Sequence, residues 1–492
     1  MSGNGTTRRE FLRAAGLGAA SLAVPGVVNC GIGGRERLPN IVYILADDMG
    51  YGDPQCNNEE SKIPTPNMDR LARGGRRFTD VHSPSAVCTP TRYGILTGRY
   101  CWRTHLKSGV LWGYSPNMIE PGRLTVPALL KKHGYSTAGM GKWHLGLGRD
   151  EKVDYSKPLH PGPNEHGFDY YFGIPASLDM EPYLYIENDR AVQQPTLEID
   201  ASPMPAFYRG GPIAPGFRHI DVMPTITERA VGFIRRHHAN RPDSPFFLYF
   251  PLTAPHTPWL PVDFVKGRSK AGVYGDFVTL VDWTVGQVLD TLDSLGMTDN
   301  TLVILTSDNG ADERFLLPEY GHEANYVFRG QKADIWDGGH RIPFFARWPG
   351  KIEAGSECAE TICLTDLLAT CAAIVGEKLP GSAGEDSYDI LPAMLGKQTG
   401  EPIREATVHH SIEGMFSVRQ GEWKLVLGRG SGGFGWKEAD FIPKPGEAAG
   451  QLYNIAEDIA ETRNLCSERR DVVERLTALL ERYKEQGYSR PM

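Results

Sequence analysis

One cysteine of this chain stands among residues whose types and spacing could support nucleophilic chemistry. Cys88, Pro90 and Arg92 form the pattern C-x-P-x-R, and the sequence LTGR follows at residues 96–99. If a helix begins near Pro90, Arg92 lies about one turn from Cys88, where it can hold the oxygens of a nucleophile and nearby carboxylates. A buried free cysteine in a turn is the plainer alternative. Cys88 and Arg92 are therefore candidates for a catalytic centre.

Two pairs of residues offer oxygen ligands for a metal ion. Asp47 and Asp48 follow one apolar run, and Asp308 and Asn309 follow another. Oxygen ligands suit a hard cation such as calcium or magnesium and argue against zinc. Adjacent aspartates by themselves are more often a turn or a helix cap. Two such pairs, each at the end of a strand, favour a metal site.

Four basic side chains could bind an anion. Lys142 and His144 are two apart, so in an extended segment both point to the same side. His256 stands between two prolines, and Lys332 lies in the sequence RGQK. The chain has a formal net charge of -8, so an anionic substrate has to be attracted by a local cluster of cations. Singly, each of these residues is more often an ordinary surface or core residue.

The elements that must position these residues read as an α/β fold. Continuous apolar runs at residues 40–46, 136–140, 245–250 and 302–306 have the length of buried strands, and each is followed by the polar residues described above. Apolar residues at helical spacing over residues 281–295 predict a helix. Alternating strands and helices predict a large, mixed but mostly parallel sheet sandwiched by helices. Ligands bind such sheets outside the carboxyl ends of the strands, so one site is expected there.

The chain is predicted to contain two domains after a leader. Residues 38–384 form the catalytic domain, and residues 385–492 form a smaller C-terminal α+β domain with short strands at 416–419 and 423–427 and a closing helix over 472–483. The eight cysteines include no C-x-x-C pair, and their spacing fits no zinc template. Basic residues are scattered along the chain, which argues against nucleic acid as a partner.

Several motifs together resemble the formylglycine-dependent, arylsulfatase-like sulfatases of the alkaline phosphatase superfamily. These are the C-x-P-x-R segment with its LTGR extension, GKWHLG at residues 141–146 and RGQK at residues 329–332. The resemblance covers about residues 39–350 and 452–465. It implies that a maturation enzyme oxidises Cys88 to formylglycine. A hydrated aldehyde can expel sulfate by collapsing to the carbonyl, which a serine cannot do.

The resemblance also implies roles for the other candidates. Calcium, in preference to magnesium, would bind Asp47, Asp48, Asp308, Asn309 and the modified Cys88. Lys142 and Lys332 would bind sulfate, His144 would act as the base that releases sulfate, and His256 would protonate the leaving alcohol. Asp337 stands where the family more often has glutamate. His322 is a candidate sugar contact, although a surface-loop histidine is the commoner reading.

The predicted activity is hydrolysis of sulfate monoesters by a sulfuric ester hydrolase. Residues 102–114, 178–218 and 319–326 are expected to form loops over the pocket, and their aromatic and basic content suits sugar rings, so the expected substrate is a sulfated carbohydrate or another sulfated small molecule. Two alternatives remain: a phosphonate or phosphodiester hydrolase of the same superfamily, and a catalytically silent carbohydrate-binding lipoprotein.

The first residues resemble an export signal. Residues 1–30 contain the pair Arg8 and Arg9 before a mildly apolar run, as in twin-arginine signals, and Cys30 stands at a possible lipoprotein processing site. The protein is therefore expected to be exported, in the periplasm or cell envelope. A membrane is expected as a partner only through a lipid on Cys30.

Overall fold

The computed structural model describes residues 1, 37–398, 400–435 and 448–491. The predicted export signal with Arg8 and Arg9, and the possible lipoprotein cysteine Cys30, lie outside the described residues. Leu38–Met492 forms one compact unit, so the boundary predicted at residue 384 falls inside it. None of the described helices combines the length and apolarity needed to span a membrane.

The core of the fold is a ten-stranded sheet in the order β13-β2-β12-β11-β1-β10-β4-β5-β6-β7. Its four central strands are β11 (Thr301–Ser307), β1 (Asn40–Asp47), β10 (Phe246–Pro255) and β4 (Ser136–Lys142). They run parallel to one another, every residue in them is buried, and they contain the four predicted strands. The outer strands are β13 (Ser356–Cys358), β2 (Arg76–Phe78), β12 (Phe344–Arg347), β5 (Tyr170–Ile174), β6 (Ile186–Glu187) and β7 (Arg190–Ala191). The mixed, mostly parallel sheet is therefore confirmed.

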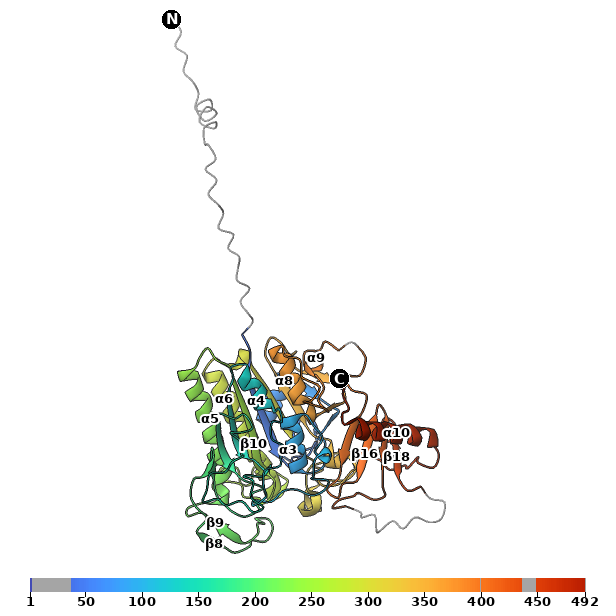
Figure 1. Cartoon of the computed structure of the whole chain (residues 1–492), viewed down its shortest axis with the longest axis horizontal. Coiled ribbons are helices and arrows are strands. Elements are labelled where there is room, and N and C mark those ends of the chain that lie inside the picture. The colour runs from blue at the N-terminus through green and yellow to red at the C-terminus, as the bar shows by residue number, and fades with distance from the viewer. Residues whose placement is uncertain (2–36, 399, 436–447, 492) are drawn as a thin grey trace. The chain divides into compact units, whose positions relative to one another are not determined.

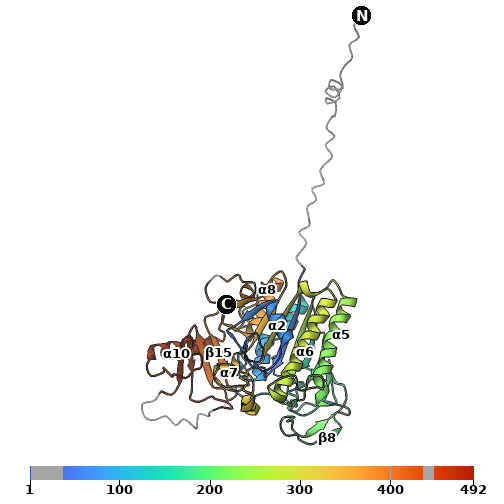
Figure 2. The ribbon, with the colours of Figure 1, turned by 180° about the vertical axis from the view of Figure 1, so that it is seen from behind.

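Helices cover both faces of this sheet (Figures 1 and 2). One face carries α2 (Pro66–Arg73), α5 (Val222–Asn240) and α6 (Gly272–Ser294), and the other carries α3 (Cys88–Thr97), α4 (Val126–Lys132) and α8 (Leu367–Val375). The predicted apolar stripe lies on α6, where Val281, Val285 and Val288 are completely buried. Burial of such a stripe is the main free-energy gain that holds a helix on a sheet. The short elements beside these are α7 (Asp337–His340), α9 (Leu391–Met394) and two small two-stranded sheets, β3 (Val81–His82) with β14 (Ile362–Cys363) and β8 (Leu197–Ile199) with β9 (Gly211–Ile213).

A second, antiparallel sheet forms the C-terminal part. Its strands are β15 (Thr407–His410), β16 (Phe416–Gln420), β17 (Trp423–Val426) and β18 (Gln451–Asn454), in that order. Helix α10 (Arg470–Gln486) packs on it through Val472, Leu476, Leu479 and Leu480. The predicted small α+β part is confirmed. Residue Ser85, just before the C-x-P-x-R segment, bridges to His410 at the end of β15, so the two sheets meet close to the candidate nucleophile.

Candidate active site

Most of the predicted site residues converge at the carboxyl ends of the central strands. Strand β1 lies between β10 and β11, and Ala46 is level with Ser307, so Asp47 and Asp48 emerge beside Asp308. The backbone N–H of Asp48 donates to Asp308 Oδ1 over 3.2 Å. Asp48 has a φ of 64°, and this sharp turn aims its carboxylate back over the strand ends. Parallel topology thus joins residues that lie more than two hundred positions apart in the sequence.

Cys88 is the first residue of helix α3, and Arg92 lies one turn further on the same helix. Arg92 is completely buried and donates to Asp308 Oδ2 through Nη2 (2.7 Å) and Nε (3.0 Å), and to the carbonyl of Lys142 (3.1 Å). Cys88 is 3% exposed, and burial raises the pKa of its thiol although Lys142 and Lys332 oppose the shift. An unmodified Cys88 would therefore be a thiol and a weak nucleophile at neutral pH.

The oxygen ligands form a set that suits a hard cation. One ligand atom from each of Asp47, Cys88 and Asp308 lies within 4.8 Å of the others. Asn309 donates from Nδ2 to Asp48 Oδ1 (2.7 Å), and its buried Oδ1 has no hydrogen-bond partner. A buried acceptor without a partner is costly unless a ligand satisfies it, and a cation beside the carboxylates would do so. The residues present therefore fit the predicted calcium.

Charges in the site balance only as long as no metal or substrate is bound. Lys142 Nζ lies 2.8 and 2.9 Å from the two oxygens of Asp47, and Lys332 Nζ lies 2.6 Å from Asp48 Oδ2. With the Arg92–Asp308 pair, three cations match three carboxylates. A divalent cation would leave a surplus of two positive charges in a buried site, which attracts an anion; a sulfate monoester, with its single negative charge, would neutralise half of that surplus. Because the metal would compete for the carboxylates, it would also free the two lysines for the anion.

The same charges act on the carboxyl groups of the site. Burial alone would raise the pKa of Asp47, but Lys142, His256 and Arg92 hold it well below its usual range. Burial and the neighbouring Asp47 raise the pKa of Asp308 to about 6. A divalent cation favours the ionised form of both groups, so the two carboxylates and the metal stabilise one another.

His144 is arranged to accept a proton. It is 1% exposed, and its Nε2 donates to the carbonyl of Leu111 over 2.7 Å, which leaves Nδ1 buried without a partner. Burial, with Lys142 and Arg92, lowers the pKa of His144 well below its usual value, so the ring is neutral and Nδ1 carries a lone pair. Gly141 has a φ of 126°, and a Cβ there would lie 1.8 Å from the carbonyl oxygen of Pro251. Glycine is therefore required at this position of β4, next to Lys142, where the backbone passes close to that of Pro251.

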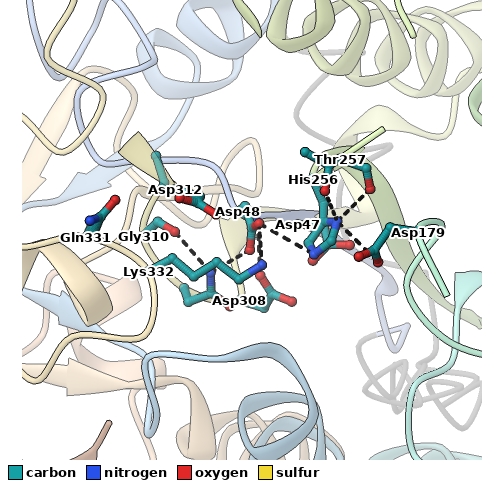
Figure 3. Close-up of polar contacts among 12 residues, drawn as sticks. Asp47, Asp48, Asp179, His256, Thr257, Asp308, Gly310, Asp312, Gln331 and Lys332 are labelled. Atoms are coloured by element: carbon teal, nitrogen blue, oxygen red, sulfur yellow. Dashed lines mark hydrogen bonds and ion pairs between the residues drawn. The ribbon is translucent and has the colours of Figure 1, made fainter. Parts of the chain in front are cut away.

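Figure 3 shows His256 and Lys332 on either side of Asp48. His256 Nδ1 donates to the carbonyl of Thr257 over 2.7 Å, and its Nε2 lies 3.7 Å from Asp48 Oδ2. The ring is 6% exposed, so Nε2 faces the carboxylates at the site with little access for water. This position suits a group that hydrogen-bonds to the oxygen bridging sulfur and the leaving group.

Sequence reasoning missed one charged residue beside His256. Asp179 is 5% exposed and its Oδ1 lies 4.0 Å from His256 Nδ1, yet this oxygen has no hydrogen-bond partner. Arg209 donates to the other oxygen of Asp179 and lies 4.9 Å from the ring centroid of Trp112, which is 49% exposed. Two of the predicted loops thus supply an acceptor, a cation and an aromatic face. Only the loops were predictable, because Asp179 belongs to no recognisable motif.

His322 is held beneath the site instead of facing a ligand. Its Nε2 lies 2.8 Å from Asp53 Oδ1, its Nδ1 accepts from the backbone N–H of Lys62 (3.4 Å), and its side chain is 2% exposed. The other oxygen of Asp53 accepts from the backbone N–H of Gly50 over 2.8 Å. His322 therefore supports the loop that follows Asp48, and both ring nitrogens are engaged there.

Comparison with known proteins matches most of the chain. A sequence model of the family described as Sulfatase matches residues 39–377. The N-acetylgalactosamine-6-O-sulfatase of Bacteroides thetaiotaomicron is 33% identical over 494 residues, covering 92% of this chain and 94% of that protein. The Mus musculus N-acetylgalactosamine-6-sulfatase is 34% identical over 406 residues, covering 80% of this chain and 73% of that protein. A similar fold is found in a solved sulfatase structure from work on the metabolism of multiple glycosaminoglycans by Bacteroides thetaiotaomicron. The TM-score is 0.80 at 32% identity, and the match covers 91% of this chain and 100% of that one.

Proposed function

This chain belongs to the sulfatase family and is a sulfuric ester hydrolase, and from this premise we propose that it removes the 6-O-sulfate of N-acetylgalactosamine residues, with formylglycine at position 88 and a bound calcium ion. The observation that carries the catalytic part is the meeting of Cys88, Arg92 and Asp308 with the two buried lysines at the strand ends. The choice of sugar rests on the names of the two relatives compared above.

The residues of the chain can perform both halves of the reaction. One hydroxyl of the hydrated aldehyde, having released its proton to water, attacks sulfur as the S–O bond to the sugar breaks. His256 gives the departing sugar oxygen a proton and later recovers one from water. His144 then takes the proton of the second hydroxyl, the carbonyl re-forms, and sulfate leaves; water rehydrates the aldehyde. Lys142 and Lys332 hold the sulfate oxygens throughout. A calcium ion bound by Asp47, Asp48, Asp308 and Asn309 would supply positive charge where negative charge develops.

A panel of substrates tests the proposed activity. Release of inorganic sulfate is expected to be fastest from N-acetylgalactosamine 6-sulfate, and slower from the 4-sulfate, from glucosamine 6-sulfate and from a small aryl sulfate. Faster turnover of a phosphodiester or phosphonate would instead favour the alternative hydrolase of the same superfamily. If purified protein bearing the aldehyde binds the sugars without releasing sulfate, the silent binding protein becomes the better account.

Loss of His256 is expected to lower the rate most for substrates whose leaving group needs a proton. His256→Asn should lower kcat on the sugar sulfate by about 10²-fold or more, because an alkoxide is a poor leaving group. A nitrophenyl sulfate, whose phenolate leaves unaided, should lose far less. Rates on both substrates for the two proteins measure this difference. The control is His160→Asn, an exposed loop histidine, which should change neither rate. Equal losses on both substrates would contradict the role.

Asp179 is expected to bind the sugar and not the sulfate. Asp179→Asn keeps the size of the side chain but removes the charge that pairs with Arg209, so KM for the sugar sulfate should rise about tenfold. The KM for a small aryl sulfate should rise much less, because that substrate has no hydroxyl group to bind. The matched control is Asp189→Asn, a loop aspartate that pairs with His160. Equal changes for both substrates would mean that Asp179 acts on sulfate binding or on folding.

Export and maturation form part of the same proposal. A twin-arginine signal with Arg8 and Arg9 carries folded proteins, so Cys88 would have to be oxidised in the cytoplasm before transport. Expression in a host without a maturation enzyme should then yield a Cys88 thiol and little activity. Fractionation of the native host, with a Cys30→Ala variant, would show whether the protein reaches the cell envelope and whether a lipid holds it there.

A further inference from the structure

Three histidines from distant parts of the chain meet in the core between the two sheets. His82 lies in β3, His340 ends α7, and His409 lies in β15; each is completely buried. The two Nδ1 atoms of His82 and His340 are 2.9 Å apart, and the ring centroids of His409 and His340 are 4.0 Å apart, with the two planes tilted by 31°. One nitrogen from each of the three rings lies within 4.8 Å of the others. We call these residues the histidine trio.

The opposite nitrogen of each ring has a partner of the kind that surrounds metal-binding histidines. His82 Nε2 lies 3.0 Å from Asp80 Oδ1, and His340 Nε2 lies 3.1 Å from the carbonyl of Ile335. His409 Nδ1 lies 3.4 Å from Ser417 Oγ, while its Nε2 is buried without a partner. Arg419 Nη1 also lies 2.9 Å from His82 Nε2, and Lys424 Nζ lies 3.2 Å from His340 Nε2. When these two cations donate to their carboxylates instead, the outer nitrogens can donate to Asp80 and to the Ile335 carbonyl, which orients the rings for a ligand at their centre.

We propose that the histidine trio binds a zinc ion through Nδ1 of His82, Nδ1 of His340 and Nε2 of His409. Imidazole nitrogen is a preferred zinc ligand, whereas calcium takes oxygen. Zinc–nitrogen bonds of about 2.0–2.1 Å in a tetrahedral site separate two ligand atoms by roughly 3.3 Å. His82 and His340 need to part by only a few tenths of an ångström to reach that spacing. This site is separate from the calcium site, which has no histidine among its ligands.

Each ring has to present the ion with a nitrogen that carries no proton. Imidazole binds a metal in its neutral form, with its single proton on the other ring nitrogen. One of the two rings that share a proton between their Nδ1 atoms has to move that proton to its own Nε2, where Asp80 or the Ile335 carbonyl accepts it.

The charges around the trio determine the fourth ligand. Three carboxylates face three cations, namely Asp80, Asp337 and Glu461 with Arg341, Arg419 and Lys424. These groups sum to no net charge, so they leave the two charges of a zinc ion uncompensated. A hydroxide as fourth ligand, formed when bound water releases a proton, would lower that surplus to one. Lys424 lies 3.2 Å from His340 Nε2 and can remain paired with Asp337 and Glu461, which it contacts over 2.7 and 2.8 Å.

A zinc ion here would join three segments that position the catalytic residues. The carbonyl of His340 accepts from the backbone N–H of Ser83, and that of His410 accepts from Ala86, two residues before Cys88. The carbonyl of Ala86 in turn accepts from Ala333, which follows Lys332. The histidine trio therefore acts as a positioning device for the nucleophile and the sulfate-binding lysine, and it touches neither directly.

The metal content of untagged protein from zinc-supplemented cells tests the proposal. We expect about one zinc per chain in addition to calcium, and less than about a tenth of that in His409→Ala. Calcium content and the far-ultraviolet circular dichroism of the variant should be retained. His410→Ala, which removes the neighbouring buried histidine, is the matched control and should keep its zinc. Growth with cobalt in place of zinc should give the visible absorption of tetrahedral Co²⁺ in the wild type and not in His409→Ala.

Two results would overturn the inference. One is wild-type protein that contains calcium but substantially less than one zinc per chain, a measurement that needs no variant to fold. The other is equal zinc in His409→Ala and the wild type, which would place the ion elsewhere. Neither result bears on the sulfatase activity, because that is tested by sulfate release and by the calcium content.

Discussion

Cys88→Ser is expected to stop turnover after no more than one sulfate ester per enzyme. A serine hydroxyl at the start of α3 would have the same support from Arg92 and the calcium site, so it could accept the sulfuryl group. It has no second hydroxyl through which to expel sulfate, so the sulfated serine would accumulate. Steady-state sulfate release should fall by about 10⁴-fold or more.

Mass spectrometry separates this result from simple loss of folding. The tryptic peptide of residues 78–92 should carry an aldehyde in the matured wild type, and a sulfuryl group in Cys88→Ser after incubation with substrate. Cys101→Ser replaces a buried cysteine outside the site and should keep full activity and the aldehyde. Sustained turnover by Cys88→Ser would contradict the proposed nucleophile, since a serine ester must be cleaved at sulfur by water.

Loss of calcium is expected to have an effect of similar size. Asp308→Asn removes one of the three carboxylates that would hold the ion and breaks the buried pair with Arg92, whose partner oxygen is 2.7 Å away. The calcium content should fall well below one ion per chain and kcat by about 10³-fold or more, because the charge that opposes the developing anion is lost. Losing one partner of a buried ion pair costs about 3–5 kcal/mol, so the unfolding free energy should also decrease.

Chelation distinguishes the role of the metal from that of the fold. Treating the wild type with a calcium chelator should abolish activity, and calcium should restore it more fully than magnesium, because the site offers several protein oxygen ligands, whereas magnesium usually keeps several waters and binds one or two carboxylates. Asp263→Asn, which replaces an exposed aspartate paired with Lys266, is the control for loss of a single carboxylate. Full activity in protein shown by elemental analysis to lack calcium would contradict the proposal.

Local patterns were enough to predict the central elements of the fold. The apolar run at residues 40–46 and the helical spacing of Val281, Val285 and Val288 match β1 and α6 because a buried strand and a helix packed on a sheet each impose their own period. The order of the ten strands could not be predicted from these local patterns. Pairing of β2 with β12 and β13 depends on contacts between residues about 280 positions apart, as in Arg76 with Ser356.

His322 and Asp179 show the same limit of sequence-based prediction within the site. The sequence identified His322 as a polar residue in a loop over the pocket, and the fold turned it toward Asp53 instead. Asp179 stood in a loop without a motif, and the fold placed its unpartnered oxygen 4.0 Å from His256. The direction of a side chain in a loop depends on which distant segment packs beneath it, and no local period records that.

Sequence alone identified the candidate catalytic residues of this protein. The residue types and order of Cys88, Arg92, Lys142, His256 and Lys332 carry the family resemblance, and the positions of Asp47 and Asp308 at strand ends imply a shared edge. Tertiary structure alone decided how charges balance there, which oxygens and nitrogens lack partners, and that His82 meets His340 across 258 residues of chain. The physical reason is that side-chain type and local period are properties of short segments. Burial, pKa and ligand geometry arise only when segments pack together.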